Sequence, residues 1–179
     1  MNPGKPITRE SIAQAHRRIA QDVRRTPLWR MPGRALGVDC AEVWLKLELL
    51  QLSGSFKARG MFNRLRSADI PAAGVTIASG GNAGIAAATA ARALGVACEV
   101  FVPELSSAAK RQALQALGAR LVVQGASYVE ALAACLARQR NSGALLMHAY
   151  DQPEVVEGAG TLAAEIENEA GGLPDRLLV

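Results

Sequence analysis

The chain has 179 residues, of which 50% are hydrophobic, so it is long and apolar enough to bury a core and does not fit a disordered protein. Its net charge is +4, and the basic residues are scattered and do not alternate with aromatic residues, which make up only 4% of the chain. This pattern argues against a nucleic-acid partner, while a mild positive charge suits a small anionic ligand.

The three cysteines, Cys40, Cys98 and Cys135, lie far apart and follow no metal-ligand spacing. They predict buried thiols of a reducing compartment and no metal site. The start of the chain contains no apolar stretch of the kind that a secretory signal carries, and no later segment is as long as a membrane span. We therefore expect a soluble cytoplasmic protein without a membrane partner.

In chain order, the first predicted element is an amphipathic helix at residues 12–23, "IAQAHRRIAQDV", with Thr8 or Ser11 as its N-cap. Its polar face carries His16, which we expect to be solvated and to which we assign no functional role. An extended linker is expected at residues 24–33, "RRTPLWRMPG", because Pro27 and Pro32 oppose helix formation.

From Val43 onward, short apolar runs alternate with helical patterns. The predicted strands are residues 43–49, 74–79, 97–103, 119–124 and 144–150. The predicted helices are residues 56–68, 82–95, 107–118, 127–140 and 153–170. Two of these helices end at glycines suited to a left-handed cap, Gly95 and Gly118. Repeated strand–helix units predict an α/β fold with parallel sheets covered by helices on both faces, and with ligands at the carboxyl ends of the strands.

Two strand–helix junctions carry the residues best suited to chemistry. "SGSFK", residues 53–57, puts Lys57 at the start of a helix, where the partial positive charge of the helix disfavours a second cation. Such an amine loses its proton more readily and can form a Schiff base. "ASGGNAG", residues 78–84, offers backbone N–H groups to a carboxylate or phosphate. Taken alone, each junction has a plain structural explanation, a surface lysine or a helix cap, but both are expected at the same end of one sheet.

The dinucleotide-binding fingerprint and the phosphate-binding P-loop motif are both missing from the sequence. At the two junctions, however, the chain resembles the fold type II pyridoxal-phosphate enzymes, and among them the serine/threonine dehydratases. The resemblance runs from about Thr26 to Val179 and rests on "SGSFKARG" and "ASGGNAGIAAATAARALGV", followed by "VFVPE", "LGARLVVQGASYVEA" and "MHAYDQPEVVEGAGTLAAEI".

By this resemblance, Lys57 holds pyridoxal phosphate in a Schiff base and removes the α-proton of the substrate. Phe56 is implied to pack against the cofactor ring, and Asn82 to form a hydrogen bond with the ring hydroxyl. The implied substrate-carboxylate loop comprises Ser79, Gly80, Gly81, Asn82 and Ala83. The implied reaction removes water from L-serine or L-threonine and yields a 2-oxo acid and ammonia. The complete protein is implied to be a homodimer.

The resemblance also implies a two-lobed architecture of which this sequence holds a part. Residues 1–50 would begin a large cofactor domain, residues 51–150 would form a small α/β domain with both junctions, and residues 151–179 would return into the large domain. "RLLV", residues 176–179, predicts the start of one more strand, and the family's phosphate loop and pyridine-nitrogen partner come after that strand. We therefore expect a fold that is truncated at its C-terminus and that binds cofactor weakly on its own.

Several departures from the family pattern bear on the reaction. Gly80 stands where racemase relatives have an acid/base serine, which counts against racemase activity. Ala83 and Gly84 look more like the serine dehydratase variant, which slightly favours serine as substrate. Ala58 replaces the aspartate typical of β-replacement relatives such as threonine synthase or cysteine synthase. That reaction stays open as an alternative, as does a short, non-catalytic protein that pairs with another chain.

Overall fold

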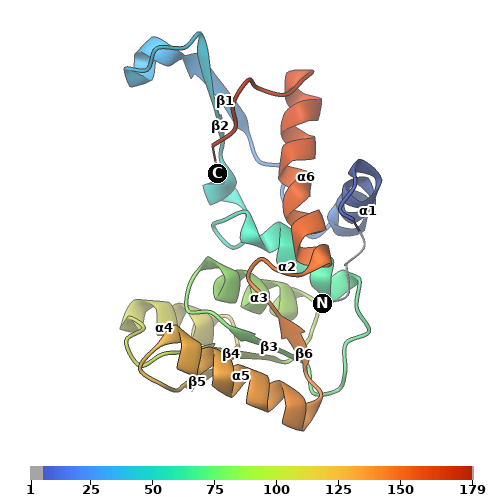
Figure 1. The fold of residues 1–179 in the computed structure, drawn as a ribbon, viewed down its shortest axis with the longest axis vertical. Coiled ribbons are helices and arrows are strands. Elements are labelled where there is room, and N and C mark those ends of the chain that lie inside the picture. Colours follow the sequence, from blue (N-terminus) through green and yellow to red (C-terminus); the bar gives the residue numbers. More distant parts are fainter. Residues whose placement is uncertain (1–5, 179) are drawn as a thin grey trace.

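A computed structural model describes residues 6–178 (Figure 1). The helices are α1 (Arg9–Ile19), α2 (Lys57–Arg66), α3 (Asn82–Ala93), α4 (Ala108–Ala116), α5 (Tyr128–Ser142) and α6 (Pro153–Ala170), with short 3-10 helices η1 (Gly33–Leu36) and η2 (Glu48–Leu50). The strands are β1 (Leu28–Pro32), β2 (Glu42–Lys46), β3 (Val75–Ala78), β4 (Cys98–Val102), β5 (Arg120–Val123) and β6 (Leu145–Met147). Figure 1 shows β3 to β6 with α3, α4 and α5 at one end, β1, β2 and most of α6 at the other, and α2 between them.

Four strands form one parallel sheet in the order β5-β4-β3-β6. Successive residues of β3 point to opposite faces of the sheet, as the period of a strand requires. Val75 and Ile77 lie in the larger apolar core with residues of α2 and α3, whereas Ala78 packs with Cys135 of α5. Helices therefore cover both faces of the sheet, and the α/β class expected from the sequence is confirmed.

The prediction for the segment before this sheet is wrong in two respects. Residues Leu28–Pro32 form β1 instead of an unpaired linker, and the run at residues 43–49 forms β2 instead of joining the parallel sheet. The two strands pair antiparallel, with Leu28 opposite Lys46 and Pro32 opposite Glu42. Proline is tolerated in this pair because Pro32 ends a strand of a two-stranded sheet, where a missing N–H interrupts no further ladder.

Local signals at the helix ends are confirmed. Thr8 caps α1, since its Oγ1 accepts a hydrogen bond from the Ser11 backbone N–H while Ser11 Oγ accepts one from the Thr8 N–H. This capping box makes the helix begin at Arg9, a turn earlier than predicted. Gly95 and Gly118 follow α3 and α4 with φ angles of 67° and 81°, which only glycine adopts readily.

The strand expected at "RLLV" is not formed by residues 176–178, and Val179 lies outside the described residues. The apolar pattern alone does not make a strand, because a strand also needs a neighbour to satisfy its backbone N–H and C=O groups. Among the cysteines, Cys98 and Cys135 are buried as predicted, whereas Cys40 is exposed in the loop that precedes β2.

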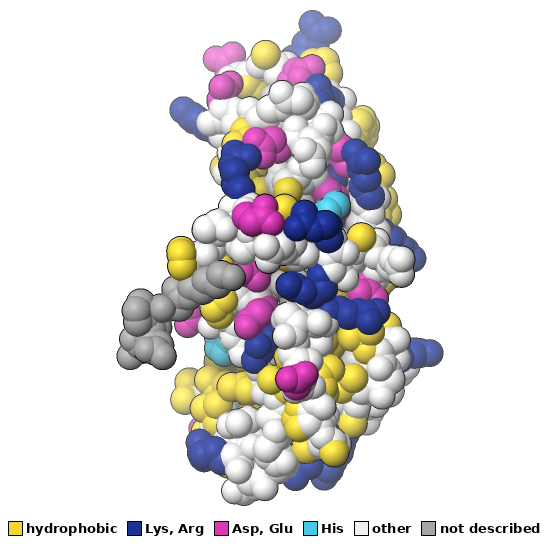
Figure 2. Space-filling view, turned by 90° about the vertical axis from the view of Figure 1, so that its right-hand side faces the viewer, with side chains coloured by type: hydrophobic (Ala, Val, Ile, Leu, Met, Phe, Trp, Pro, Cys, Tyr) yellow, Lys and Arg dark blue, Asp and Glu magenta, His cyan; other side chains and the backbone are white. Residues whose placement is uncertain are grey.

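The surface carries charges of both signs. Figure 2 shows basic and acidic side chains next to one another over the middle of the face turned to the viewer. Ion pairs between distant parts of the chain include Arg9 with Glu167 and Arg66 with Asp22, both at 2.7 Å. Within residues 6–178, none of the helices combines the length and the apolarity that crossing a membrane requires.

Candidate active site

Lys57 is the first residue of α2, and its side chain is half-buried. Its Nζ donates a hydrogen bond to the backbone oxygen of Ala149, 2.9 Å away. Ala149 follows Met147, the last residue of β6, by two positions, so the amine reaches the carboxyl end of the parallel sheet. This is the end at which open parallel sheets bind their ligands.

Two aromatic rings lie near the Lys57 amine. Nζ is 4.9 Å from the ring centre of Phe56 and 5.9 Å from that of Tyr150. A pocket of about 170 Å³ opens here, and its mostly apolar wall includes Phe56, Lys57, Gly60, Tyr150, Val155 and Ala159. Burial lowers the pKa of Lys57 from its ordinary 10.5. The amine is therefore more easily neutral, and so more nucleophilic, than a solvated lysine.

The loop Ser79–Ala83 leads from β3 into α3 at the same end of the sheet. β3 and β6 are neighbours, with Ile77 opposite Met147, so this loop follows the strand next to the one that leads to Ala149. The Gly81 N–H donates to Ser79 Oγ at 3.3 Å and closes the turn. Because the first N–H groups of a helix have no partner within it, the start of α3 can bind a carboxylate or a phosphate.

Glycines give this loop its shape. A Cβ at Gly84 would lie 1.9 Å from the backbone oxygen of Ser79, so the loop folds back on its helix more closely than any side chain allows. A Cβ at Gly80 would lie 3.1 Å from Ser106 Oγ, whereas one at Gly81 would meet nothing within 4 Å. The loop is thus packed on the protein side at positions 80 and 84 and open at Gly81.

The structure groups the predicted residues into two neighbouring sets. Phe56 and Lys57 line the pocket, whereas the loop Ser79–Ala83 follows the adjacent strand and does not contribute to the pocket wall. Asn82, the first residue of α3, is exposed. The sequence argument missed Ala149 and Tyr150, because 92 positions separate Lys57 from its hydrogen-bond partner Ala149. An aromatic residue directly after a predicted strand, as in "MHAY", was the available signal.

Comparisons with known proteins agree with the sequence resemblance. Residues 19–179 match the family described as pyridoxal-phosphate dependent enzyme. A curated relative, the L-threonine ammonia-lyase of Thermotoga maritima, is 34% identical over 171 residues, which make up 94% of this chain and 42% of that protein.

Two solved structures are similar in fold. A threonine deaminase from the bacterium abbreviated T.th. has a TM-score of 0.81 and 32% identity, over 93% of this chain and 54% of that one. The serine racemase of maize has a TM-score of 0.84 and 28% identity, over 90% of this chain and 50% of that one. The chain thus spans between 42% and 54% of the length of these relatives. Because the family match covers nearly the whole sequence, the chain belongs to the pyridoxal-phosphate dependent enzymes.

Proposed function

We propose that this protein removes water from L-serine or L-threonine with pyridoxal phosphate as cofactor, and that the products are a 2-oxo acid and ammonia. The observation that carries the proposal is the position of Lys57, a half-buried amine with a lowered pKa beside an aromatic-walled pocket. The names of two relatives support the reaction, since one is an L-threonine ammonia-lyase and the other a threonine deaminase.

The residues around Lys57 fit a flat, phosphorylated aromatic aldehyde. The rings of Phe56 and Tyr150 offer apolar surface to an aromatic ring. Ser55 Oγ, two residues before the lysine, is buried and has no hydrogen-bond partner among residues 6–178, so it can receive a polar group of a ligand. The open side of the loop at Gly81 leaves space above the start of α3. Amine, ring surface, hydroxyl and backbone donors are the groups that pyridoxal phosphate and an amino acid require.

Each residue has a distinct part in the proposed reaction. When bound, pyridoxal phosphate supplies a sink for the electron pair that remains when the Cα–H bond breaks. Lys57 holds the cofactor and, once the substrate amino group has displaced it, accepts the α-proton on Nζ. Its lowered pKa keeps Nζ neutral and able to accept that proton. Phe56 packs on one side of the cofactor ring, and the amide of Asn82 donates a hydrogen bond to the ring hydroxyl.

The loop Ser79–Ala83 binds the substrate carboxylate in this proposal. Its backbone N–H groups lie at the start of α3, where the partial positive charge of the helix favours an anion. A carboxylate held there orients the Cα–H bond with respect to Lys57, because the loop and Ala149 follow neighbouring strands. Loss of the α-proton and the β-hydroxyl releases one water, and hydrolysis that releases ammonia consumes one water. The net products are therefore a 2-oxo acid and ammonia.

Assay of the full-length protein with pyridoxal phosphate tests the proposal. L-serine or L-threonine alone should yield equal amounts of 2-oxo acid and ammonia, and borohydride should fix the cofactor on Lys57. We expect Lys57→Ala to lower product release about 10³-fold or more. Substitution of the exposed Lys110 by alanine is the matched control and should leave the rate unchanged. Equal product release by the Lys57→Ala protein, or cofactor fixed on another residue, would sink the proposal.

A second candidate function is racemisation of serine, because the fold is similar to the serine racemase of maize. Gly80 carries no hydroxyl to exchange a proton on the other face of the substrate, and a side chain there would crowd Ser106. We therefore favour dehydration, and chiral chromatography of the remaining serine distinguishes the two. A β-replacement enzyme would instead need a second nucleophile, and a non-catalytic partner protein would be indifferent to the Lys57→Ala change.

We also propose how the chain is organised and where it works. Residues 51–150 act as a small domain and residues 1–50 and 151–179 belong to a larger cofactor domain; the support is that the parallel sheet lies between Val75 and Met147. A homodimer is supported by exposed apolar side chains at Trp29, Leu36 and Val38. A cytoplasmic location is supported by the exposed free thiol of Cys40.

A further inference from the structure

Arg59, two residues after Lys57 on α2, is fully buried, and an arginine is almost never fully buried unless it is paired. Glu48 of η2 accepts hydrogen bonds from Nε at 2.9 Å and from one terminal nitrogen at 2.8 Å. Glu165 of α6 accepts from both terminal nitrogens, at 2.7 and 2.9 Å. Each carboxylate therefore binds one edge of the planar guanidinium with a pair of hydrogen bonds.

Two further partners complete the surroundings of the Arg59 guanidinium. Thr161 Oγ1 lies 3.3 Å from one terminal nitrogen and the backbone oxygen of Arg24 lies 3.4 Å from the other. Burial opposes the charge of Arg59, but hydrogen bonds and charge from Glu48 and Glu165 outweigh burial and raise its pKa above the ordinary value. A lysine here would keep the charge and lose the two-sided geometry, because an ammonium group has no planar fork of donors.

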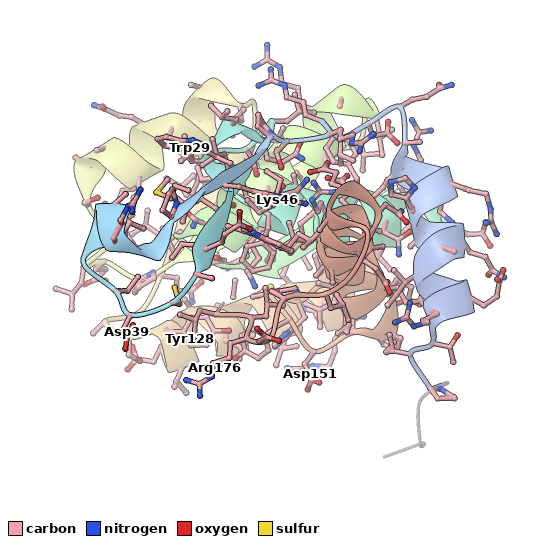
Figure 3. The ribbon with its side chains drawn as sticks, turned by 90° about the horizontal axis from the view of Figure 1, so that it is seen from above. Trp29, Asp39, Lys46, Tyr128, Asp151 and Arg176 are labelled. Carbon is pink, nitrogen blue, oxygen red and sulfur yellow. The ribbon has the colours of Figure 1, made fainter. Side chains whose placement is uncertain are left out.

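Lys46 extends these contacts to β2. Its side chain is 6% exposed, and its Nζ lies 2.9 Å from Glu165 Oε2 and 3.0 Å from Glu169 Oε1. Figure 3 shows Lys46 between the β1–β2 pair and α6. We call this group the Arg59 cluster, and its members are Lys46, Glu48, Arg59, Glu165 and Glu169. The cluster joins β2, η2, α2 and α6, which are far apart in the sequence.

A buried ion cluster is weak evidence for stability. Taking charges out of water costs about as much as their attraction returns, and well-packed apolar residues in the same space are often as stable. Paired hydrogen bonds differ from apolar contacts in that they restrict angles as well as distances. The contribution of the Arg59 cluster is therefore best sought in the orientation of the elements that it joins.

Lys57 is the nearby group that depends on orientation. Successive residues of a helix are rotated by about 100°, so Lys57 and Arg59 project about 200° apart around α2. A rotation that moved Arg59 off its carboxylates would also swing the Lys57 amine away from the Ala149 oxygen. The N-cap residue Phe56 makes no side-chain capping hydrogen bond that would resist such a rotation.

The same two segments meet Lys57 and Arg59. The loop before α6 supplies the Ala149 oxygen for Lys57, and α6 itself supplies Glu165 for Arg59. We propose that Arg59 is a positioning residue that, held between Glu48 and Glu165, fixes the rotation of the first turn of α2 and keeps the Lys57 amine in its pocket. The catalytic value of that placement rests on the function proposed above, whereas the placement itself does not.

The pH midpoint of Lys57 reactivity tests this inference without any cofactor. Competitive acylation of the full-length protein, followed by peptide mass spectrometry, measures that midpoint for each lysine. Arg59→Lys keeps the charge and removes the fork. The matched control is Arg66→Lys, because Arg66 forms the same paired contact with Asp22 at the other end of α2, at 2.9 and 2.7 Å.

We expect Arg59→Lys to raise the Lys57 midpoint by about half a pH unit or more, since a displaced amine is more solvated. Borohydride trapping of pyridoxal phosphate on Lys57 should slow about tenfold. Arg66→Lys should change neither quantity. A folded Arg59→Lys protein with an unchanged Lys57 midpoint would show that the cluster is structural only, and would overturn the inference.

A second variant covers the case in which Arg59→Lys does not fold, as circular dichroism would reveal. Glu48→Gln keeps the shape of the side chain and an oxygen acceptor but removes one charge, and it should move the Lys57 midpoint in the same direction by less. An unchanged midpoint in this variant also overturns the inference. If pyridoxal phosphate is not trapped on Lys57 even in the unsubstituted protein, the proposed function fails, while the acylation comparison still decides the role of Arg59.

Discussion

At the scale of single residues, the protonation state of Lys57 decides what this site can do. Its pKa is lowered from the ordinary 10.5 by burial, which favours the neutral amine. The fraction of neutral amine rises as the pH rises through the pKa, so a lowered pKa shifts nucleophilic reactivity to lower pH. We therefore predict that acylation of Lys57 reaches half of its maximal rate at a pH below 10.5.

The exposed Lys110 provides an internal reference for this prediction, because the same digest reports both residues. Phe56→Ala gives a second check, since loss of the ring exposes the amine and should move the Lys57 midpoint upward. A Lys57 midpoint equal to that of Lys110 in the unsubstituted protein would contradict the burial argument. It would also remove the chemical reason for assigning proton abstraction to this lysine.

At the scale of helices and strands, local signals in the sequence were sufficient where the ends of an element are chemically marked. α6 spans Pro153–Ala170 as predicted, because proline occupies its first turn and Gly171 adopts the left-handed cap with φ 72°. β1 was missed because its proline suggested a linker and its partner β2 lies in another part of the chain. Pairing of strands is a long-range property that apolar periodicity does not encode.

The candidate site was predictable to a similar extent. Lys57, Phe56 and the loop Ser79–Ala83 were found because they stand in contiguous, recognisable motifs. Arg59 was missed although it lies in one of these motifs, because a lone arginine is normally solvated and the sequence does not indicate its burial. Its partner Glu165 is 106 positions away, and only the packing of α6 on α2 brings the two together.

The close packing of α2 on α6 gives the prediction at this scale. A Cβ at Gly158 would lie 2.4 Å from the Arg59 backbone oxygen and 2.8 Å from Gly60 Cα, so any side chain forces the two helices apart. We predict that Gly158→Ala lowers the free energy of unfolding by about 1–3 kcal/mol, as overpacking of a rigid contact does. Urea titration of the full-length protein, followed by circular dichroism, measures this change.

Gly160 supplies the matched control in the same helix. A Cβ there would meet only side-chain atoms of Ile12, the nearest at 2.8 Å, and a flexible side chain can turn aside. The better helix propensity of alanine, about 1 kcal/mol, partly offsets that adjustment. Gly160→Ala should thus cost less than Gly158→Ala. Equal losses in the two variants would show that backbone contact between α2 and α6 does not limit the site at Gly158.

At the scale of the whole molecule, the Arg59 cluster links the β1–β2 pair to the helices, and its charge state depends on pH. Burial alone would raise the pKa of Glu165, but hydrogen bonds and charge from Arg59 and Lys46 outweigh burial and hold it below the ordinary 4.5. His16 of α1 also faces Glu165, at 3.9 Å. The pKa of Glu169 is likewise lowered, because hydrogen bonds from its basic partners outweigh its burial.

A carboxylate with a lowered folded-state pKa stabilises the fold fully above its unfolded-state pKa, and that stability is lost as the pH falls through the folded-state value. We therefore predict that the free energy of unfolding declines as the pH falls below about 4.5, the unfolded value for glutamate. Glu165→Gln should lose about 3–5 kcal/mol at pH 7, because it leaves buried cations uncompensated. Its decline below pH 4.5 should be shallower than that of the unsubstituted protein, since Glu165 no longer titrates. Urea titrations from pH 7 downward measure both quantities, with the exposed Glu10→Gln as control. Parallel pH curves for Glu165→Gln and the unsubstituted protein would show that protonation of Glu165 does not release the β1–β2 pair from the helices.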